Sequence, residues 1–290
     1  MDVVICLSAK DHHIVKTNIK YIRKYLQTND EYIYIISNVK NRIFFSDKWQ
    51  EKRNVIFVDE DKMVDGLSMQ AVRTTMQKHF SCQKYPGWYL QQFLKMGFAL
   101  SKYAKQRYLI WDSDTIPLHQ LSYFDNGKYL LTAKDENHTP YFDTIERLLG
   151  FRRLADYSFI AEHMPIDVDV MKELLNAISC SKVEGRYWFE KILNATSGKD
   201  QQAFSEFETY GNYCLLYHPD IFVTRRLRTL REAGLLFGRS VRKSDIERLS
   251  MMNFDTASFE IRHKPRFPQI IFYWYDRIQL AVMRRLGLVN

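Results

Sequence analysis

Cysteine and glycine are both scarce in this chain of 290 residues. The four cysteines, Cys6, Cys82, Cys180 and Cys214, are far apart, and no two of them form a C-x-x-C pair. That absence excludes the common zinc and dithiol motifs, so we expect reduced thiols in a cytoplasmic protein. Only 11 residues are glycine, whereas 19 are Phe and 18 are Tyr, which is typical of a folded globular protein.

Long apolar segments and several familiar motifs are also missing. No stretch of about 18 uncharged apolar residues is present, so we expect no membrane-spanning helix. The start of the chain lacks a basic segment, and its apolar run is too short for a signal peptide. No P-loop, kinase or nucleic-acid-binding motif occurs, which disfavours ATP-driven phosphoryl transfer and a nucleic-acid partner.

The net charge of +8 is concentrated at the C-terminal end. Residues 225–290 hold 14 Lys and Arg against 6 Asp and Glu, so this segment accounts for the whole excess. A basic segment after a neutral body favours an anionic partner for the segment alone. We therefore expect a catalytic domain over residues 1–222 and a basic extension over 223–290, with the oligomeric state left open.

The expected elements alternate between strands and helices. Strands are predicted at 3–7, 32–36, 54–58, 108–111, 129–133, 213–217 and 258–261, and helices at 11–27, 68–79, 88–103, 167–178, 186–195, 223–236, 244–252 and from 268. This order predicts an α/β fold with a mostly parallel sheet flanked by helices. In such sheets the ligand crevice lies beyond the carboxyl ends of the strands.

Two carboxylates end the apolar run 108–111. Asp112 and Asp114 are separated by Ser113, and Pro117 stops the strand from continuing. Because unpaired buried charge is costly, a divalent cation such as Mg²⁺ or Mn²⁺ would compensate both acids. The alternative is a solvated turn after an edge strand.

A second strand end and one helical face carry further polar candidates. Ser8, Ala9 and Asp11 follow the first strand, where a nucleotide base or ribose would bind, although Asp11 would also suit a helix cap. The spacing of Trp88, Gln91, Gln92 and Lys95 places all four on one helical face, which would bind sugar hydroxyls or phosphate. An ordinary surface helix with one partly buried Trp is the alternative.

Two acids in an aromatic segment are candidates for a general base. Glu206 and Glu208 lie among aromatic residues, and partial burial would raise the pKa of a glutamate toward the useful range. Ser205 would cap a helix here with Glu208 as its capping-box partner, so we prefer Glu206 as the base.

The histidines are less distinctive. His263 is a candidate third metal ligand, and Glu162 with His163 would line an acceptor site. Ordinary surface or hydrogen-bonded histidines are the alternative in both cases.

Taken together, four segments resemble GT-A-fold glycosyltransferases of bacterial surface-polysaccharide clusters. They are 87–95, 108–118, 158–164 and 204–212, in that order, and the resemblance covers about residues 2–219. It implies a nucleotide-diphosphate-sugar donor and a divalent cation that bridges the diphosphate to Asp114, with Asp112 near the ribose or the metal.

The resemblance also implies a saccharide acceptor on the far side of the site, near Tyr210 and Asn212 in the last of these segments. In inverting members a carboxylate near the start of a late helix deprotonates the acceptor hydroxyl, which fits Glu206 or Glu208. His263 resembles the late metal ligand of some retaining families.

The C-terminal segment 266–289 mixes aromatic, aliphatic and arginine residues. An interfacial helix has this composition, so we expect peripheral binding to the inner face of the cytoplasmic membrane, suited to a lipid-linked acceptor. Packing of the helix on the core or on a second subunit is the alternative. For the whole protein, the competing functions are metal-dependent nucleotidyl or phosphoryl transfer and non-enzymatic binding of acidic polymers.

Overall fold

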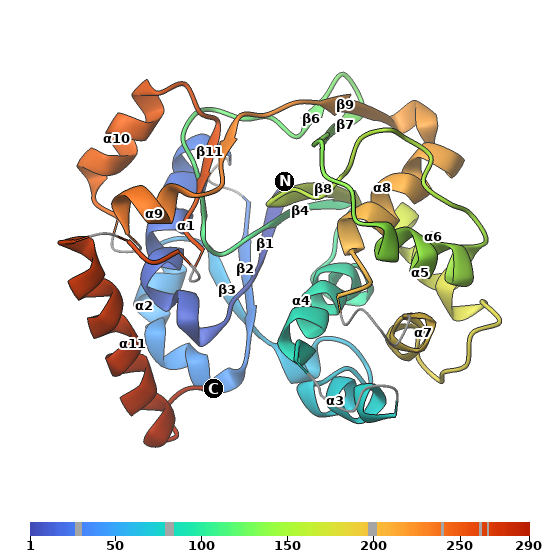
Figure 1. Cartoon of the computed structure of the whole chain (residues 1–290), viewed down its shortest axis with the longest axis horizontal. Coiled ribbons are helices and arrows are strands. Elements are labelled where there is room, and N and C mark those ends of the chain that lie inside the picture. Colours follow the sequence, from blue (N-terminus) through green and yellow to red (C-terminus); the bar gives the residue numbers. More distant parts are fainter. Residues whose placement is uncertain (27–30, 79–83, 197–201, 239–240, 261–262, 266) are drawn as a thin grey trace. The chain divides into compact units, whose positions relative to one another are not determined.

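The structure, a computed structural model, describes the chain except for residues 27–30, 79–83, 197–201, 239–240, 261–262 and 266 (Figure 1). Cys82, Arg266 and the predicted element ends at 27, 79 and 261 therefore lie outside the described residues. The chain divides into two compact units. Unit 1 contains Met1–Asp59, Ile110–Ser122 and Arg226–Asn290, and unit 2 contains Glu60–Leu109 and Tyr123–Arg225.

Unit 1 begins with three parallel strands, β1 (Asp2–Cys6), β2 (Ile33–Ser37) and β3 (Val55–Asp59). β1 and β2 are buried along their whole length, which explains their continuous apolar sequence. The connections contain η1 (Ala9–Asp11), α1 (His12–Tyr25), η2 (Val39–Phe44) and α2 (Asp47–Glu51). In the central sheet the strand order is β3-β2-β1-β4-β8, and the division between the units runs through β4 (Arg107–Trp111).

A second, three-stranded sheet completes unit 1. β5 (Thr115–Pro117) pairs antiparallel with β11 (Thr256–Ser258), which pairs parallel with β10 (Thr229–Leu230). The helices of this part are α9 (Ala233–Phe237), α10 (Lys243–Met251) and α11 (Gln269–Arg285). A core cluster joins Ile14 of α1 to Ile116, Ile246 and Phe259. The C-terminal segment is thus part of the packed body of unit 1 from residue 226 onward.

Unit 2 is mostly helical. Its helices are η3 (Glu60–Lys62), α3 (Met69–Gln77), α4 (Pro86–Gly97), η4 (Phe98–Leu100), α5 (Thr139–Leu149), α6 (Val168–Ser179), α7 (Trp188–Ala195), α8 (Glu206–Tyr217) and η5 (Pro219–Ile221). Its strands are β6 (Phe124–Asp125), β7 (Lys128–Thr132), β8 (His163–Asp167) and β9 (Phe222–Arg225), and β7 pairs with β6 antiparallel and with β9 parallel. Phe93 of α4 packs against Trp188, Phe189 and Phe204.

The predicted α/β class, with a mainly parallel sheet and flanking helices, is confirmed. Two predicted elements are wrong. Residues 213–217 form the last part of α8 instead of a strand, because Ser205 begins the helix upstream and the apolar run continues it. Residues 223–236 form β9, β10 and the short α9 instead of one basic helix. None of the helices that the structure describes is long and apolar enough to cross a bilayer.

Candidate functional site

The two acids predicted to hold a metal lie in a tight turn between β4 and β5. The Thr115 amide donates to the Asp112 carbonyl over 3.2 Å, which closes the turn. Ser113 is buried, whereas Asp112 and Asp114 are each partly exposed. The predicted strand end is therefore correct, and both acids are partly exposed, although Asp112 Oδ1 itself is buried.

A buried asparagine holds the backbone of this turn. Asn18 of α1 has no exposed surface, and its Nδ2 donates to the carbonyls of Asp112 over 3.0 Å and of Ser113 over 3.1 Å. On the other side, the Phe259 amide donates to the Asp114 carbonyl over 2.9 Å. All three turn residues thus have their carbonyl positions fixed by groups that are distant in sequence.

The strand-end loop after β1 reaches the same turn through one side chain. Ser113 Oγ lies 3.3 Å from Asp11 Oδ2, to which it donates a hydrogen bond. Asp11 precedes α1 but makes no side-chain cap bond, so the alternative of a helix cap is wrong. Asp11 is buried, and its carboxylate accepts from Ser113. In the same loop Ser8 is exposed and Ala9 packs inward with 2% exposure.

His263 lies in the same unit as the two acids. It is 5% exposed, and its Nδ1 has no hydrogen-bond partner among the described residues. The ring lies against Gly234, where an added Cβ would come within 3.1 Å of it. Within the part of the chain that the structure describes, no three His, Cys, Asp or Glu side chains are grouped as a metal site.

The donors at the turn nevertheless fit a hard divalent cation. Two partly exposed carboxylates on an ordered turn would provide the oxygen ligands that such a cation prefers. The buried His263 Nδ1, which has no partner among the described residues, is a nitrogen atom of the kind that binds such cations. Metal ligation by Asp112, Asp114 and His263 stays a prediction.

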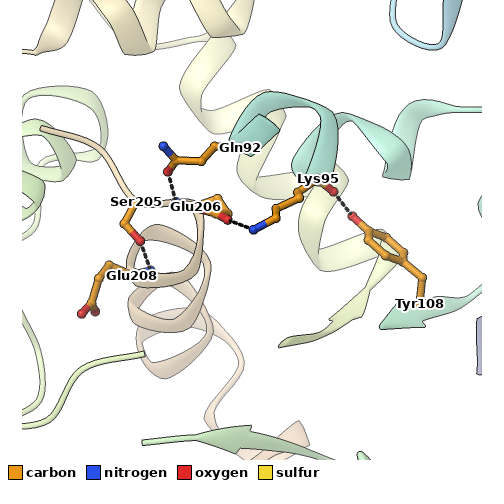
Figure 2. Close-up of polar contacts among 6 residues, drawn as sticks. All are labelled: Gln92, Lys95, Tyr108, Ser205, Glu206 and Glu208. Carbon is orange, nitrogen blue, oxygen red and sulfur yellow. Dashed lines mark hydrogen bonds and ion pairs between the residues drawn. The ribbon is translucent and has the colours of Figure 1, made fainter. Parts of the chain in front are cut away.

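In unit 2, the predicted polar face of α4 meets the start of α8. Lys95 Nζ lies 2.9 Å from Glu206 Oε1, and both side chains are buried. The Glu206 amide donates to Gln92 Oε1 over 3.0 Å, and the Tyr108 hydroxyl donates to the Lys95 carbonyl over 2.9 Å. Figure 2 shows how these side chains converge from α4, β4 and α8. Lys95 Nζ also lies 4.7 Å from the centre of the Phe207 ring.

The burial of α4 contradicts the alternative given for this helix. Gln92 and Lys95 are 3% and 5% exposed, and Trp88 and Gln91 are half-buried, so the alternative of an ordinary surface helix is wrong. Lys95 is directed to the buried Glu206 carboxylate, which needs an opposite charge, and Gln92 Oε1 accepts from the Glu206 backbone amide. Donor binding by these four residues stays a prediction.

Glu208 has a different environment from Glu206, two residues away. The Glu208 amide donates to Ser205 Oγ over 3.3 Å, so Ser205 caps α8. The predicted return bond from the Glu208 side chain is absent, because that carboxylate accepts from the Ser158 hydroxyl and, over 3.2 Å, from Asn212 Nδ2. Burial raises the pKa of the Glu208 carboxyl, and these hydrogen bonds oppose that rise.

The residues predicted to bind an acceptor are all buried, with exposed fractions of 5% or less. The Tyr210 hydroxyl accepts from the Asp167 amide over 2.8 Å, and Asn212 Oδ1 accepts from the Leu154 amide over 3.0 Å. Lys134 Nζ lies 3.7 Å from Glu162 Oε2. In this conformation these side chains present little surface to an acceptor, and their binding role stays a prediction.

His163 is neutral in this environment. Burial, with smaller contributions from Arg225 and Lys134, lowers the pKa of His163 to about 3, although Glu162 opposes the shift. At physiological pH it therefore offers no positive charge to a ligand.

Comparison with known sequences identifies the family. A family model described as a family of unknown function, DUF6492, matches residues 8–236. The chain belongs to the DUF6492 family. No curated protein sequence matches it.

Several solved structures resemble this DUF6492 protein at a distance. The galactosyltransferase LgtC, in complex with donor and acceptor sugar analogues, is 11% identical, with coverage of 97% of this chain and 96% of that one and a TM-score of 0.44. Mouse xyloside xylosyltransferase 1 is 13% identical, with coverage of 90% and 98% and a TM-score of 0.45. GlyE of Streptococcus pneumoniae TIGR4 is 10% identical, with coverage of 100% and 64% and a TM-score of 0.39. At these scores the likeness is too distant to establish a shared activity.

Sequence reasoning missed one residue, Asn18, and one pairing in this DUF6492 chain. Asn18 sits in the middle of an amphipathic helix, and only its long-range contacts with Asp112 and Ser113 reveal its role. The pairing of Lys95 with Glu206 spans 111 residues, so neither neighbourhood predicts it.

Proposed function

We propose that this protein is a metal-dependent glycosyltransferase that moves a sugar from a nucleotide-diphosphate sugar to a saccharide acceptor. The observation that carries the proposal is the Asp112-Ser113-Asp114 turn at the carboxyl end of β4, joined to the end of β1 through Asp11. In open α/β sheets the ligand crevice lies at such strand ends. The sequence resemblance assigns the same turn to the diphosphate of the donor.

The residues of the turn would bind the donor as follows. Asp112 and Asp114 would hold Mn²⁺ or Mg²⁺ together with His263, and the cation, when bound, would supply Lewis-acid stabilisation of the departing diphosphate. Asn18 holds the backbone carbonyls of Asp112 and Ser113 in place. The turn would therefore need little rearrangement when the cation and donor bind. The exposed Ser8 would contact the nucleoside part.

A carboxylate at the start of α8 would accept the proton of the acceptor hydroxyl, in an inverting reaction. Glu206 and Glu208 both lie in the first turn of that helix. Burial raises the pKa of Glu208, which favours it as a proton acceptor, whereas Glu206 is held by the Lys95 ammonium group. Glu206, preferred from sequence, and Glu208 are therefore both candidates, and substitution of each decides between them.

The outer face of α11 supports a proposed membrane site for a lipid-linked acceptor. Ile271, Trp274, Tyr275, Ile278 and Val282 are each at least half exposed on this helix. Arg277, Arg284 and Arg285 are exposed beside them. Apolar and aromatic groups among arginines suit the interface of an anionic bilayer. A role in surface polysaccharide synthesis at the inner face of the cytoplasmic membrane would follow.

The reaction is tested by product analysis. Purified protein is incubated with a panel of UDP-, GDP- and CMP-sugars, Mn²⁺ and saccharide acceptors, and the released nucleotide is identified. Release of the nucleoside diphosphate with a new glycoside supports the proposal, and release of CMP from a CMP-sugar would contradict a diphosphate donor. Release of a sugar 1-phosphate, with transfer of the nucleoside monophosphate, would favour nucleotidyl transfer. Glu206→Gln and Glu208→Gln are then compared, and full activity in both would refute the base assignment.

The membrane proposal has its own test. Co-sedimentation is measured with vesicles of phosphatidylglycerol and of phosphatidylcholine for the wild type and for Trp274→Ala/Tyr275→Ala. We expect binding to the anionic vesicles only, reduced at least about fivefold in the variant because two interfacial aromatic groups are lost. Equal sedimentation of both proteins with anionic vesicles would contradict the proposal.

A further inference from the structure

Helix α11 has an inner face that packs on the predicted donor loop. Leu280 of α11 and Val289 near the C-terminus form a buried cluster with Ala9, and Phe44 and Met283 flank it. Leu280 is 8% exposed, in contrast to the outer face of the same helix. The methyl group of Ala9 is thus covered by the C-terminal segment, about 270 residues away in sequence.

A second contact joins the two elements next to this cluster. His13 Nε2 lies 3.5 Å from Asp276 Oδ1. Between them a small pocket is lined by Lys10, His12 and His13 on one side and by Tyr273, Asp276, Arg277 and Leu280 of α11 on the other. The first turn of α1 and the turn before it therefore lie on α11 through both apolar and polar contacts.

The short helix η1, which contains Ala9, also contacts the Asp112-Ser113-Asp114 turn through Asp11. η1 has only three residues, and its turn is closed by the Asp11 amide, which donates to the Ser8 carbonyl over 2.9 Å. Ala9 faces Leu280, and Asp11 accepts the hydrogen bond from Ser113. A shift of Ala9 would be transmitted to Asp11, because a single closed turn moves as one piece.

We propose that α11 positions the donor loop, with Leu280 and Val289 as positioning residues that hold η1 where Asp11 meets Ser113. This inference rests on the proposed function, since the loop matters only if it binds the donor. It gives the C-terminal helix a role in donor binding that is separate from membrane contact. The role acts through the backbone of 8–11, and neither positioning residue touches the donor.

Hydrogen exchange of the full-length protein tests the packing directly. In Leu280→Ala we expect the backbone amides of residues 9–13 to exchange at least about fivefold faster than in the wild type, because the cover of Ala9 is lost. Leu286→Ala is the matched control, since Leu286 is 67% exposed on the last turn of the same helix. Leu280→Met should restore slow exchange, because it keeps the buried volume.

Donor affinity supplies the functional readout. In Leu280→Ala the KM for the donor sugar nucleotide should rise about three- to tenfold while kcat changes less than about twofold, since only loop placement is affected. If Leu280→Ala does not fold, Val289→Ala, which removes less of the cluster, is measured in its place. Unchanged exchange at 9–13, or equal acceleration in Leu286→Ala, would overturn the inference. A wild type that binds no nucleotide would instead refute the proposed function, while the exchange data would still decide the packing.

Discussion

Ser113 Oγ donates a hydrogen bond to the Asp11 carboxylate over 3.3 Å, and this contact joins two strand ends that are 102 residues apart. Both residues are nearly fully buried. The contact therefore links the loop after β1 to the turn after β4. The two candidate parts of the donor site in unit 1 are therefore ordered together.

Loss of that hydroxyl should weaken nucleotide binding. Ser113→Ala leaves a buried carboxylate without one of its donors, which costs about 1–3 kcal/mol, and part of that cost should appear as a three- to tenfold higher Kd. Calorimetric titration with UDP and GDP in the presence of Mn²⁺ measures it. Ser46→Ala, at an exposed serine whose side chain caps no helix, is the control. Equal affinity in Ser113→Ala and wild type would show that the contact does not order the site.

Asn18 should be required for stability as well as for binding. Asn18→Ala removes the donor for two carbonyls, and we expect about 2–4 kcal/mol less unfolding free energy. Asn18→Asp should be worse, because a carboxylate would face the same two carbonyls without a proton to donate. Urea denaturation of both variants measures the order. An Asn18→Asp protein as stable as the wild type would contradict the assigned hydrogen bonds.

The buried ion pair in unit 2 should show strong coupling. Lys95→Met and Glu206→Gln each leave the partner's charge buried and uncompensated. Each single variant should therefore lose about 3–5 kcal/mol of unfolding free energy. The double variant should lose less than the sum of the two. A double-mutant cycle from denaturation data measures the difference, and additive losses would mean that the two side chains do not interact in solution.

The sequence predicts the first strands and helices of unit 1, but it does not predict which polar side chains contact one another at the candidate site. β1, β2 and β3 were predictable because each is a short apolar run followed by polar residues. α3 and α6 begin at Ser68 and Asp167, whose side chains cap them. The end of α8 was missed because the apolar run 213–217, Tyr-Cys-Leu-Leu-Tyr, suits a strand or a buried helix equally.

The contacts of the polar residues could not be predicted because the two partners in each contact are far apart in the sequence. Asp11 faces Ser113 and Lys95 faces Glu206 only after strands and helices from distant segments have packed. A local pattern indicates that a residue is polar and on a certain face, but the partner is chosen by tertiary structure. The placement of residues 226–290 within unit 1 is also a result of packing.

Acid should destabilise the protein partly through His163. Burial lowers its pKa to about 3 in the folded state, against about 6.5 when unfolded, so below pH 6.5 the unfolded chain binds the proton first. The stability contributed by neutral His163 is complete above pH 6.5 and is lost as the pH falls toward 3, at up to about 1.4 kcal/mol per pH unit.

His163→Gln should therefore flatten the dependence of unfolding free energy on pH between 6.5 and 4. Denaturant unfolding at several pH values measures this slope, and His119→Gln, at a partly exposed histidine, is the comparison. Identical slopes in the wild type and in both variants would rule out a buried neutral imidazole at position 163.

Metal-dependent nucleotide binding tests the central claim most directly. Calorimetric titration with UDP, GDP and CDP is performed with and without Mn²⁺, on the wild type, Asp114→Ala and the control Asp65→Ala, in which an exposed acid is removed. We predict that one nucleotide binds to the wild type and to Asp65→Ala only with Mn²⁺, and that Asp114→Ala lowers its affinity at least about thirtyfold, because a carboxylate ligand of the metal is lost. Binding that is independent of Mn²⁺ and unchanged in Asp114→Ala would contradict the account.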